Sequence, residues 1–205
     1  DLLTAMLKNI WDTAHYLTVY HSPNDNWRQH EFVSLLNTTL YIPEFKDAKS
    51  GEQWQKLASD TLGDILFLNT MEDGSYVEST TAYSVAALSD FSGFKSDMIN
   101  MGADVSAEYD ERLLKNAYYN GMLYFPDGSG LGYGDSSRIG VNYGTYKSVC
   151  DWYNAEDLRY ITTLGAQGTK PGYTSYHWKD SRVTVMRNDW TVNSPYLFTN
   201  VRGGG

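Results

Sequence analysis

The sequence has little cysteine and no long apolar run. Cys150 is the single cysteine in 205 residues, which excludes an intrachain disulfide and any metal site built from several cysteines. No stretch approaches the roughly 18 consecutive apolar residues of a membrane span, so the sequence predicts a soluble segment. The opening Asp1-Leu2-Leu3 lacks the basic region of a secretory signal. Because these residues already have helical spacing, we expect this N-terminus to be internal to a longer protein.

Positive charge is also scarce. The chain has 16 Lys and Arg against 25 Asp and Glu, a formal net charge of −9. This balance argues against nucleic acid or an anionic membrane as a partner. An enzyme of this charge that handles acidic sugars needs a local cationic patch within an acidic surface.

Aromatic residues are abundant instead. The chain contains 6 Trp and 17 Tyr, and its 41% hydrophobic content predicts a folded core. Aromatic faces stack on sugar rings, and Tyr hydroxyls and Trp N–H groups bind sugar oxygens. An aromatic-rich helical core explains the same composition, so composition alone leaves both interpretations open.

Apolar residues recur at three- and four-residue steps over the first two-thirds of the chain, which predicts about six helices in antiparallel pairs. Pro43 closes the second of these helices. The predicted helical stretches lie at residues 3–17, 32–40, 54–66, from near 78 to 87, 113–118 and 158–164.

Alternation replaces helical spacing after residue 170. Val183, Val185 and Arg187 are predicted to point to one face of a strand, and a further strand covers residues 196–201. Turns are expected at Lys179-Asp180 and near Pro195. The sequence therefore predicts a mainly α fold: residues 1–169 form an incomplete (α/α) toroid of helical hairpins, and residues 170–205 begin an antiparallel β-sandwich.

Three loop motifs combine several polar residue types. Residues 24–31 (NDNWRQHE) stand at a helix start, where simple N-capping is the alternative explanation. Residues 72–79 precede another helix start, for which Ser75 or Ser79 is a candidate cap, and Tyr83 follows. Residues 126–138 are rich in glycine, but no hydrophobic strand precedes them and no Gly-Lys-Ser/Thr follows, so a phosphate loop is excluded.

The order of these motifs resembles the helical domain of heparinase II/III-like polysaccharide lyases. Residues 126–138 resemble a glycine-rich loop of that family that ends in Gly-Asp-Ser, and residues 183–190 with 196–205 resemble the first strands of its β-sandwich. Each motif is weak alone, and their order and spacing carry the match. In sequence order the helical motifs are residues 24–31, Pro43-Glu44-Phe45, Trp54, and residues 73–79 with Tyr83.

The resemblance implies β-elimination of a uronate-containing polysaccharide, glycosaminoglycan- or alginate-like. That reaction needs a group that neutralises the carboxylate, a base for the C5 proton and an acid for the leaving oxygen. Asn26 matches the neutralising position and Tyr83 the base or acid, 57 residues further on. The third group, a histidine on the sandwich, is expected beyond Gly205, so residues 1–205 alone are expected to lack lyase activity.

Four further side chains are predicted to bind substrate. Trp27 and His30 follow Asn26, and Trp27 stands where some alginate-cleaving members carry a second histidine. Glu78 is expected to touch substrate or to hold Tyr83. Arg187 lies in a strand and is expected to bridge the two domains, although a solvent-facing position is the alternative.

The chain is expected to carry no cofactor. Zinc occurs in some family members, and the resemblance places its ligands on the sandwich; no metal-ligand spacing occurs here. The expected partners are an acidic polysaccharide and the rest of the same polypeptide, not nucleic acid or a membrane. The resemblance also implies a secreted, periplasmic or cell-surface bacterial protein.

Two other functions stay open at this point. A glycoside hydrolase on a helical barrel would use two carboxylates about 6.5–9.5 Å apart across the scissile bond. Its candidate acids are Asp73, Glu78, Asp127 and Asp135, all in loops where turn formation also explains aspartate. A non-catalytic glycan-binding module would fit the aromatic richness and the lack of the partner histidine.

Overall fold

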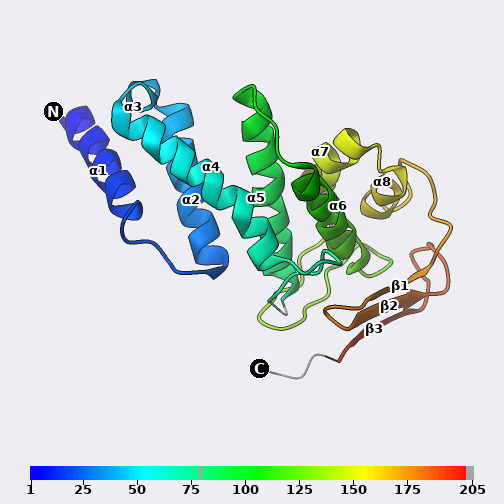
Figure 1. The fold of residues 1–205 in the computed structure, drawn as a ribbon. Coiled ribbons are helices and arrows are strands. Elements are labelled where there is room, and N and C mark those ends of the chain that lie inside the picture. Colours follow the sequence, from blue (N-terminus) through cyan, green and yellow to red (C-terminus); the bar gives the residue numbers. More distant parts are fainter. Residues whose placement is uncertain (79, 202–205) are drawn as a thin grey trace. The chain divides into compact units, whose positions relative to one another are not determined.

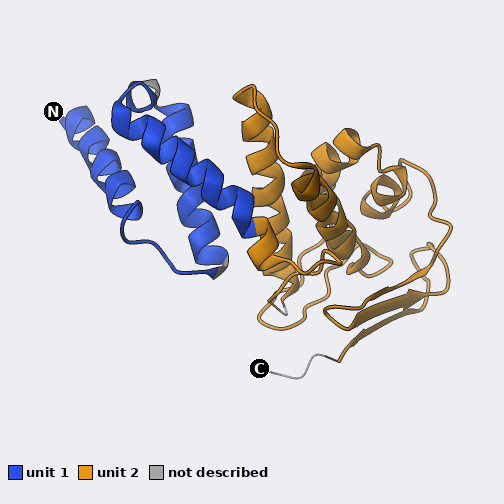
Figure 2. Ribbon diagram, viewed as in Figure 1, with its two compact units in different colours: residues 1–65 blue, residues 66–205 orange. Residues whose placement is uncertain are grey.

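The computed structural model describes residues 1–78 and 80–201. Ser79, a candidate helix cap, and the glycine run at 203–205 lie outside the described residues. The chain divides into two compact units, residues 1–65 and residues 66–205 (Figure 2).

The first unit is built of helices (Figure 1). Trp11 packs against Phe45 and Trp54 with ring centroids 5.2 and 4.5 Å apart. Phe32 and Leu36 are each only 1% exposed, and burying side chains of this size stabilises a fold by about 1.5–3 kcal/mol each. The helices are α1 (Leu2–Leu17), α2 (Asp25–Tyr41), α3 (Pro43–Lys46) and α4 (Lys49–Asn69), whose last turn belongs to the second unit.

Helix α1 has the predicted apolar stripe, but that stripe is exposed. The carboxylate of Asp1 caps the helix by accepting a hydrogen bond of 3.0 Å from the backbone N–H of Thr4. Leu3 and Met6 are 63% and 53% exposed, whereas Ala14 is buried. The helix is therefore confirmed, with Trp11 packed on Phe45 and Trp54 and with Ala14 buried.

Four helices form most of the second unit. Ser106 caps α6 by accepting a hydrogen bond of 3.1 Å from the N–H of Tyr109, and the Tyr109 hydroxyl donates to the carbonyl of Phe91 in α5. Leu88, Leu113 and Val149 are fully buried among the packed helices. The helices are α5 (Thr81–Asn100), α6 (Ala107–Met122), α7 (Tyr143–Tyr153) and α8 (Glu156–Thr162).

A three-stranded antiparallel sheet completes the second unit. Its strands are β1 (Ser175–Trp178), β2 (Val183–Arg187) and β3 (Tyr196–Asn200), paired in that order. Val183, Val185 and Arg187 are buried and Met186 is exposed, which confirms the predicted alternation. Trp178 meets Tyr119 of α6 edge to face at 5.1 Å, so one face of the sheet packs on this helix.

The mainly α fold that leads into an antiparallel sheet is confirmed. The described residues contain eight helices where the sequence predicts about six. Helix α7 was missed because Gly144, Thr145 and several aromatic residues have low helix propensity. The helix predicted from near Glu78 begins at Thr81. The domain boundary at residue 170 stays a prediction.

Candidate active site

The loop before α2 is fastened to that helix. Glu31 accepts hydrogen bonds from the backbone N–H and the hydroxyl of Ser22, at 2.7 and 3.0 Å. Arg28 donates to the carbonyl of Pro23 at 2.9 Å, and its guanidinium lies 5.7 Å from the ring centroid of Phe32. These bonds hold the first turns of α2 in a fixed position relative to the preceding loop.

Asn24 does not act as a side-chain cap at the start of α2. Asn24 is the N-cap residue, but its side chain makes no capping hydrogen bond to the described residues. Asn26 is half-buried, and its amide makes no hydrogen bond to any residue that the structure describes. Trp27 is 71% exposed. The amide and the indole are thus available to a ligand.

His30 follows Asn26 by one helical turn, a spacing that places two side chains on one face of a helix. It is exposed and takes part in an interaction within the protein. The structure therefore brings Asn26 and His30 together on α2, with Trp27 beside them.

A small hairpin precedes α5 in the second unit. Thr70 and Tyr76 form an isolated bridge, and Asp73 accepts from the N–H and the hydroxyl of Ser75. Gly74 has φ = +85°, and a Cβ there would lie 2.4 Å from the backbone of Lys115. Both the left-handed backbone conformation and the close approach of Lys115 therefore require glycine at this position. This hairpin is packed directly against α6.

Three further hydrogen bonds anchor the hairpin. The amide of Asn116 donates to the carbonyl of Gly74 at 2.8 Å. Asp73 and Asp180 bond reciprocally, each carboxylate accepting from the other residue's backbone N–H, at 2.7 and 3.0 Å. The half-buried Glu78 follows this anchored segment and makes its own interaction within the protein.

Tyr83 lies in the first turn of α5, and the glycine-rich loop holds that turn. The backbone N–H of Ala82 donates to the hydroxyl of Ser136 at 2.8 Å, and the hydroxyl of Thr81 donates to the carbonyl of Leu131. Thr80, the N-cap residue, makes no side-chain capping bond within the described part of the chain. Ser136 therefore caps α5 from 54 residues away.

The Tyr83 side chain is 37% exposed. Its hydroxyl makes no hydrogen bond to residues 1–78 or 80–201. A phenol on a braced helix turn, open to solvent and not engaged by the protein, is suited to act on a bound ligand.

Arg187, predicted to bind substrate, is 7% exposed. It donates to the carbonyls of Met122 and Tyr124 at 3.0 and 3.3 Å, and its guanidinium lies 4.3 Å from the ring centroid of Trp190. Burial lowers the pKa of Arg187, and the negative end of the α6 dipole with the ring face offsets this cost. Arg187 thus ties the sheet to α6, as the bridging interpretation predicted, and its contact with substrate stays a prediction.

The candidate acids of a hydrolase are engaged in turns. Asp127 accepts from the N–H and the hydroxyl of Ser129, at 2.9 and 2.6 Å, which lowers the pKa of Asp127. Asp73 makes the same pair of bonds to Ser75 and a third to Asp180. Asp135 is exposed in the glycine-rich loop. Turn formation accounts for both Asp-Gly-Ser sequences.

Sequence reasoning missed two positioning residues. Ser136 was noted only as part of a Gly-Asp-Ser sequence, and Asp180 only as a turn residue, because their partners lie 54 and 107 positions away. The sequence offered one clue to these residues, the repeated Asp-Gly-Ser turn. One copy lies in the hairpin that precedes α5, and the other begins the glycine-rich loop that holds the first turn of α5. Asn26 and Tyr83 belong to different units, and their pairing stays a prediction.

No three His, Cys, Asp or Glu side chains in the described residues are grouped to hold a metal ion. Within the described residues, no helix is long and apolar enough to cross a bilayer.

Comparisons with known proteins agree with this architecture. A heparin-sulfate lyase of Bacteroides stercoris is 23% identical over 203 residues, which cover 96% of this chain and 30% of that protein. A crystal structure of heparinase III matches with a TM-score of 0.87 at 19% identity, covering 100% of this chain and 33% of the other. The heparan sulfate lyase of Pedobacter heparinus matches with a TM-score of 0.76 at 20% identity, covering 99% and 32%.

The chain spans about a third of the length of these relatives. At these identities the structural likeness shows the fold. The family model described as heparinase II/III N-terminus matches residues 1–160. Since that match takes in most of the chain, the chain belongs to the heparinase II/III N-terminus family.

Proposed function

We propose that the product of the complete gene is a polysaccharide lyase that cleaves a uronate-containing glycan by β-elimination, with Asn26 and Tyr83 as catalytic residues. One observation carries the proposal. Both side chains lie in the first turn of a braced helix, and neither is hydrogen-bonded to the described residues. Family membership and the name of the heparin-sulfate lyase relative support the reaction class.

The proposed step removes the C5 proton of the uronate. The electron pair of the C–H bond forms a C4–C5 double bond, the C4–O glycosidic bond breaks, and the leaving oxygen takes a proton. The Asn26 amide donates to the carboxylate as it gains enolate character. Of Tyr83 and the histidine proposed from the sandwich, one accepts the C5 proton and the other donates a proton to the leaving oxygen.

The position of both residues also suits an anionic substrate. Asn26 is the second residue of α2 and Tyr83 the third of α5. Helix N-termini carry a partial positive charge of about +0.5 and bind anions. These dipoles supply favourable potential inside a chain whose net charge is −9.

The proposed substrate is heparan sulfate of low sulfation. The curated relative is a heparin-sulfate lyase, and the acidic chain disfavours the most highly charged glycans. Trp27, His30 and Glu78 are proposed to contact this substrate near the two catalytic side chains. A secreted, periplasmic or cell-surface location is proposed, because an extended polysaccharide is degraded outside the cytoplasm.

Product analysis tests the reaction type. The purified product of the complete gene is incubated with heparan sulfate, heparin and alginate, and unsaturated uronate is followed by its ultraviolet absorbance. We expect unsaturated ends, formed fastest from low-sulfation heparan sulfate. New reducing ends without this absorbance would identify a hydrolase and contradict the proposal.

A further inference from the structure

One cavity in the structure is lined by neither of the proposed catalytic side chains. It lies in the second unit beside α6, α8 and β1, and its volume is about 220 Å³. Ligand pockets for drug-sized molecules measure about 300–1,000 Å³, so this cavity suits one ring. The residues that line it include Lys115, Tyr118, Asp157, Tyr173, Tyr176 and Trp178.

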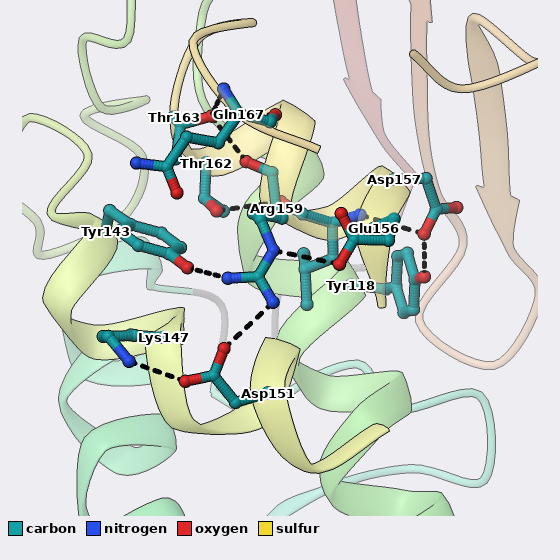
Figure 3. A network of polar contacts seen from close by, with 11 residues as sticks. Tyr118, Tyr143, Lys147, Asp151, Glu156, Asp157, Arg159, Thr162, Thr163 and Gln167 are labelled. Carbon is teal, nitrogen blue, oxygen red and sulfur yellow. Dashed lines mark hydrogen bonds and ion pairs between the residues drawn. The ribbon is translucent and has the colours of Figure 1, made fainter. Parts of the chain in front are cut away.

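Asp157 organises the polar wall. It accepts hydrogen bonds from the hydroxyls of Tyr118 and Tyr173, one on each carboxylate oxygen, and the bond to Tyr173 is 3.1 Å long. Figure 3 shows the Tyr118 hydroxyl pointing at Asp157. Burial and Asp157 raise the pKa of both tyrosines, so both remain donors. Oδ1 of Asp157 also accepts from the backbone N–H of Leu158 at 2.9 Å, so Oδ2 is the oxygen that keeps a lone pair for a ligand hydroxyl.

The Tyr176 ring provides an apolar face, and the buried Trp178 ring holds it in place. Its ring is 49% exposed and lies 4.7 Å from that of Trp178, which is 1% exposed. Trp178 in turn packs against Tyr119 of α6. The Tyr176 hydroxyl makes no hydrogen bond to any residue the structure describes. A rigid, half-exposed aromatic ring beside hydrogen-bonding groups is the arrangement that stacks on the C–H face of a sugar.

The charge of the cavity is negative. Two carboxylates, Asp73 and Asp157, line it against the single ammonium of Lys115, which also pairs with Glu111 at 2.6 Å. Arg159, in the network of Figure 3, is committed to Asp151 and Glu156 at 2.9 and 3.1 Å. An anionic ring would therefore meet repulsion, whereas a neutral ring would find acceptors for its hydroxyls.

We propose that this cavity binds one uncharged pyranose ring of a glycan, at a site that uses neither Asn26 nor Tyr83. The ring stacks on Tyr176, one of its hydroxyls donates to Oδ2 of Asp157, and Lys115 donates to a ring substituent. This site holds an uncharged unit of the glycan, while elimination acts on the uronate. Binding at this cavity does not depend on the proposed elimination reaction.

The test measures binding by the product of the complete gene. N-Acetylglucosamine is the neutral probe, glucuronate the anionic probe and glucosamine the cationic probe, each titrated with ligand-observed NMR. We expect saturable binding of N-acetylglucosamine and binding at least about tenfold weaker for glucuronate. Absence of saturable N-acetylglucosamine binding would overturn the proposal, and so would a preference for glucuronate or for glucosamine.

Three variants locate the binding. Tyr176→Ala is expected to weaken N-acetylglucosamine binding about tenfold, and Tyr176→Phe, which keeps the ring, to weaken it less. Leu197→Ala is the matched control, because Leu197 is 53% exposed on β3, paired with the outward-facing Met186. Equal weakening in the control, or full binding in Tyr176→Ala, overturns the site. Should Tyr176→Ala not fold, protection of the Tyr176 ring signals by the probe decides between the same two outcomes.

Discussion

The first turn of α5 depends on a residue far along the chain. Ser136 accepts the hydrogen bond of the Ala82 N–H at 2.8 Å, and Tyr83 is the next residue. Thr81 fixes the same turn through the carbonyl of Leu131. The position of the Tyr83 phenol is therefore set by the glycine-rich loop as well as by α5 itself.

Ser136→Ala tests this dependence. Loss of the cap is expected to lower the free energy of unfolding by about 1 kcal/mol. We also expect kcat to fall by at least about tenfold with a smaller change in KM, because a misplaced proton-transfer group impairs the transition state. Denaturant unfolding and steady-state kinetics measure both effects.

Ser137→Ala is the control, since this neighbouring serine makes no hydrogen bond within the described residues. Ser136→Thr keeps the hydroxyl and should restore part of the turnover. Equal kinetics of wild type and Ser136→Ala would show that the loop does not position Tyr83.

At the scale of elements, one buried lysine joins three helices. Lys95 of α5 pairs with Asp110 of α6 at 2.6 Å and lies 5.4 and 5.6 Å from the ring centroids of Trp152 and Tyr153 in α7. The Tyr153 hydroxyl donates to Asp110. The Lys95 side chain is 7% exposed and that of Asp110 30%. Removing the lysine from this half-buried pair is costly, because Asp110 loses its charged partner.

Lys95→Ala is expected to destabilise the protein by about 3 kcal/mol in denaturant unfolding. Lys56→Ala is the matched change in an exposed i,i+4 pair with Asp60, and its effect should stay within about 1 kcal/mol. Similar losses in the two variants would contradict the view that Lys95 joins α5, α6 and α7.

The tyrosines on Asp157 make stability depend on alkaline pH. The pKa values of Tyr118 and Tyr173 lie above the usual 10.0 in the folded protein. Above that pH the unfolded chain releases these protons and the folded chain keeps them, so stability is complete below pH 10 and falls as pH rises further.

Urea unfolding between about pH 8 and 11 should show this fall. In the double variant Tyr118→Phe, Tyr173→Phe the decrease should be shallower, because two of the titrating groups are gone. An unchanged slope in the double variant would assign the pH dependence to other tyrosines.

Local sequence patterns predicted the helices and strands better than the contacts between them. Spacing located the helices around Leu35, Leu62 and Leu113 and the alternation of β2, because burial of one face controls these patterns. Helix α7 was not predicted, because its buried face of Tyr146, Val149 and Cys150 is interspersed with residues of low helix propensity.

The supports of the candidate site could not be predicted, because they are long-range bonds. Asp73 with Asp180, and Ala82 with Ser136, join segments 107 and 54 positions apart. The spacing of residues along the chain does not predict such long-range hydrogen bonds. The candidate residues Asn26 and Tyr83 were recognised from the order of motifs. The residues that line the Asp157 cavity form no recognisable motif in the sequence.

At the scale of the whole molecule, the chain matches about a third of each relative. Of the four histidines, His21 bonds to the carbonyl of Ser22, and His177 bonds to Thr184 on the exposed side of the sheet. No histidine motif of the resembled sandwich occurs in residues 1–205. The third catalytic group is therefore proposed to come from other residues of the polypeptide.

Expression of residues 1–205 alone tests that proposal. Once circular dichroism shows a folded helical chain, we expect no appreciable formation of unsaturated uronate, because one of three catalytic groups is missing. The complete gene product serves as the positive control. Robust elimination by the 205-residue chain would show that its own residues complete the site.

Turnover by Tyr83→Phe in the complete gene product tests the central claim most directly. This change removes one oxygen and keeps the ring. We expect the rate of unsaturated uronate formation to fall by at least about 100-fold while the polysaccharide still binds, and Tyr41→Phe, at another exposed tyrosine, to keep the wild-type rate. A Tyr83→Phe variant that forms unsaturated uronate at the wild-type rate would remove Tyr83 from the mechanism.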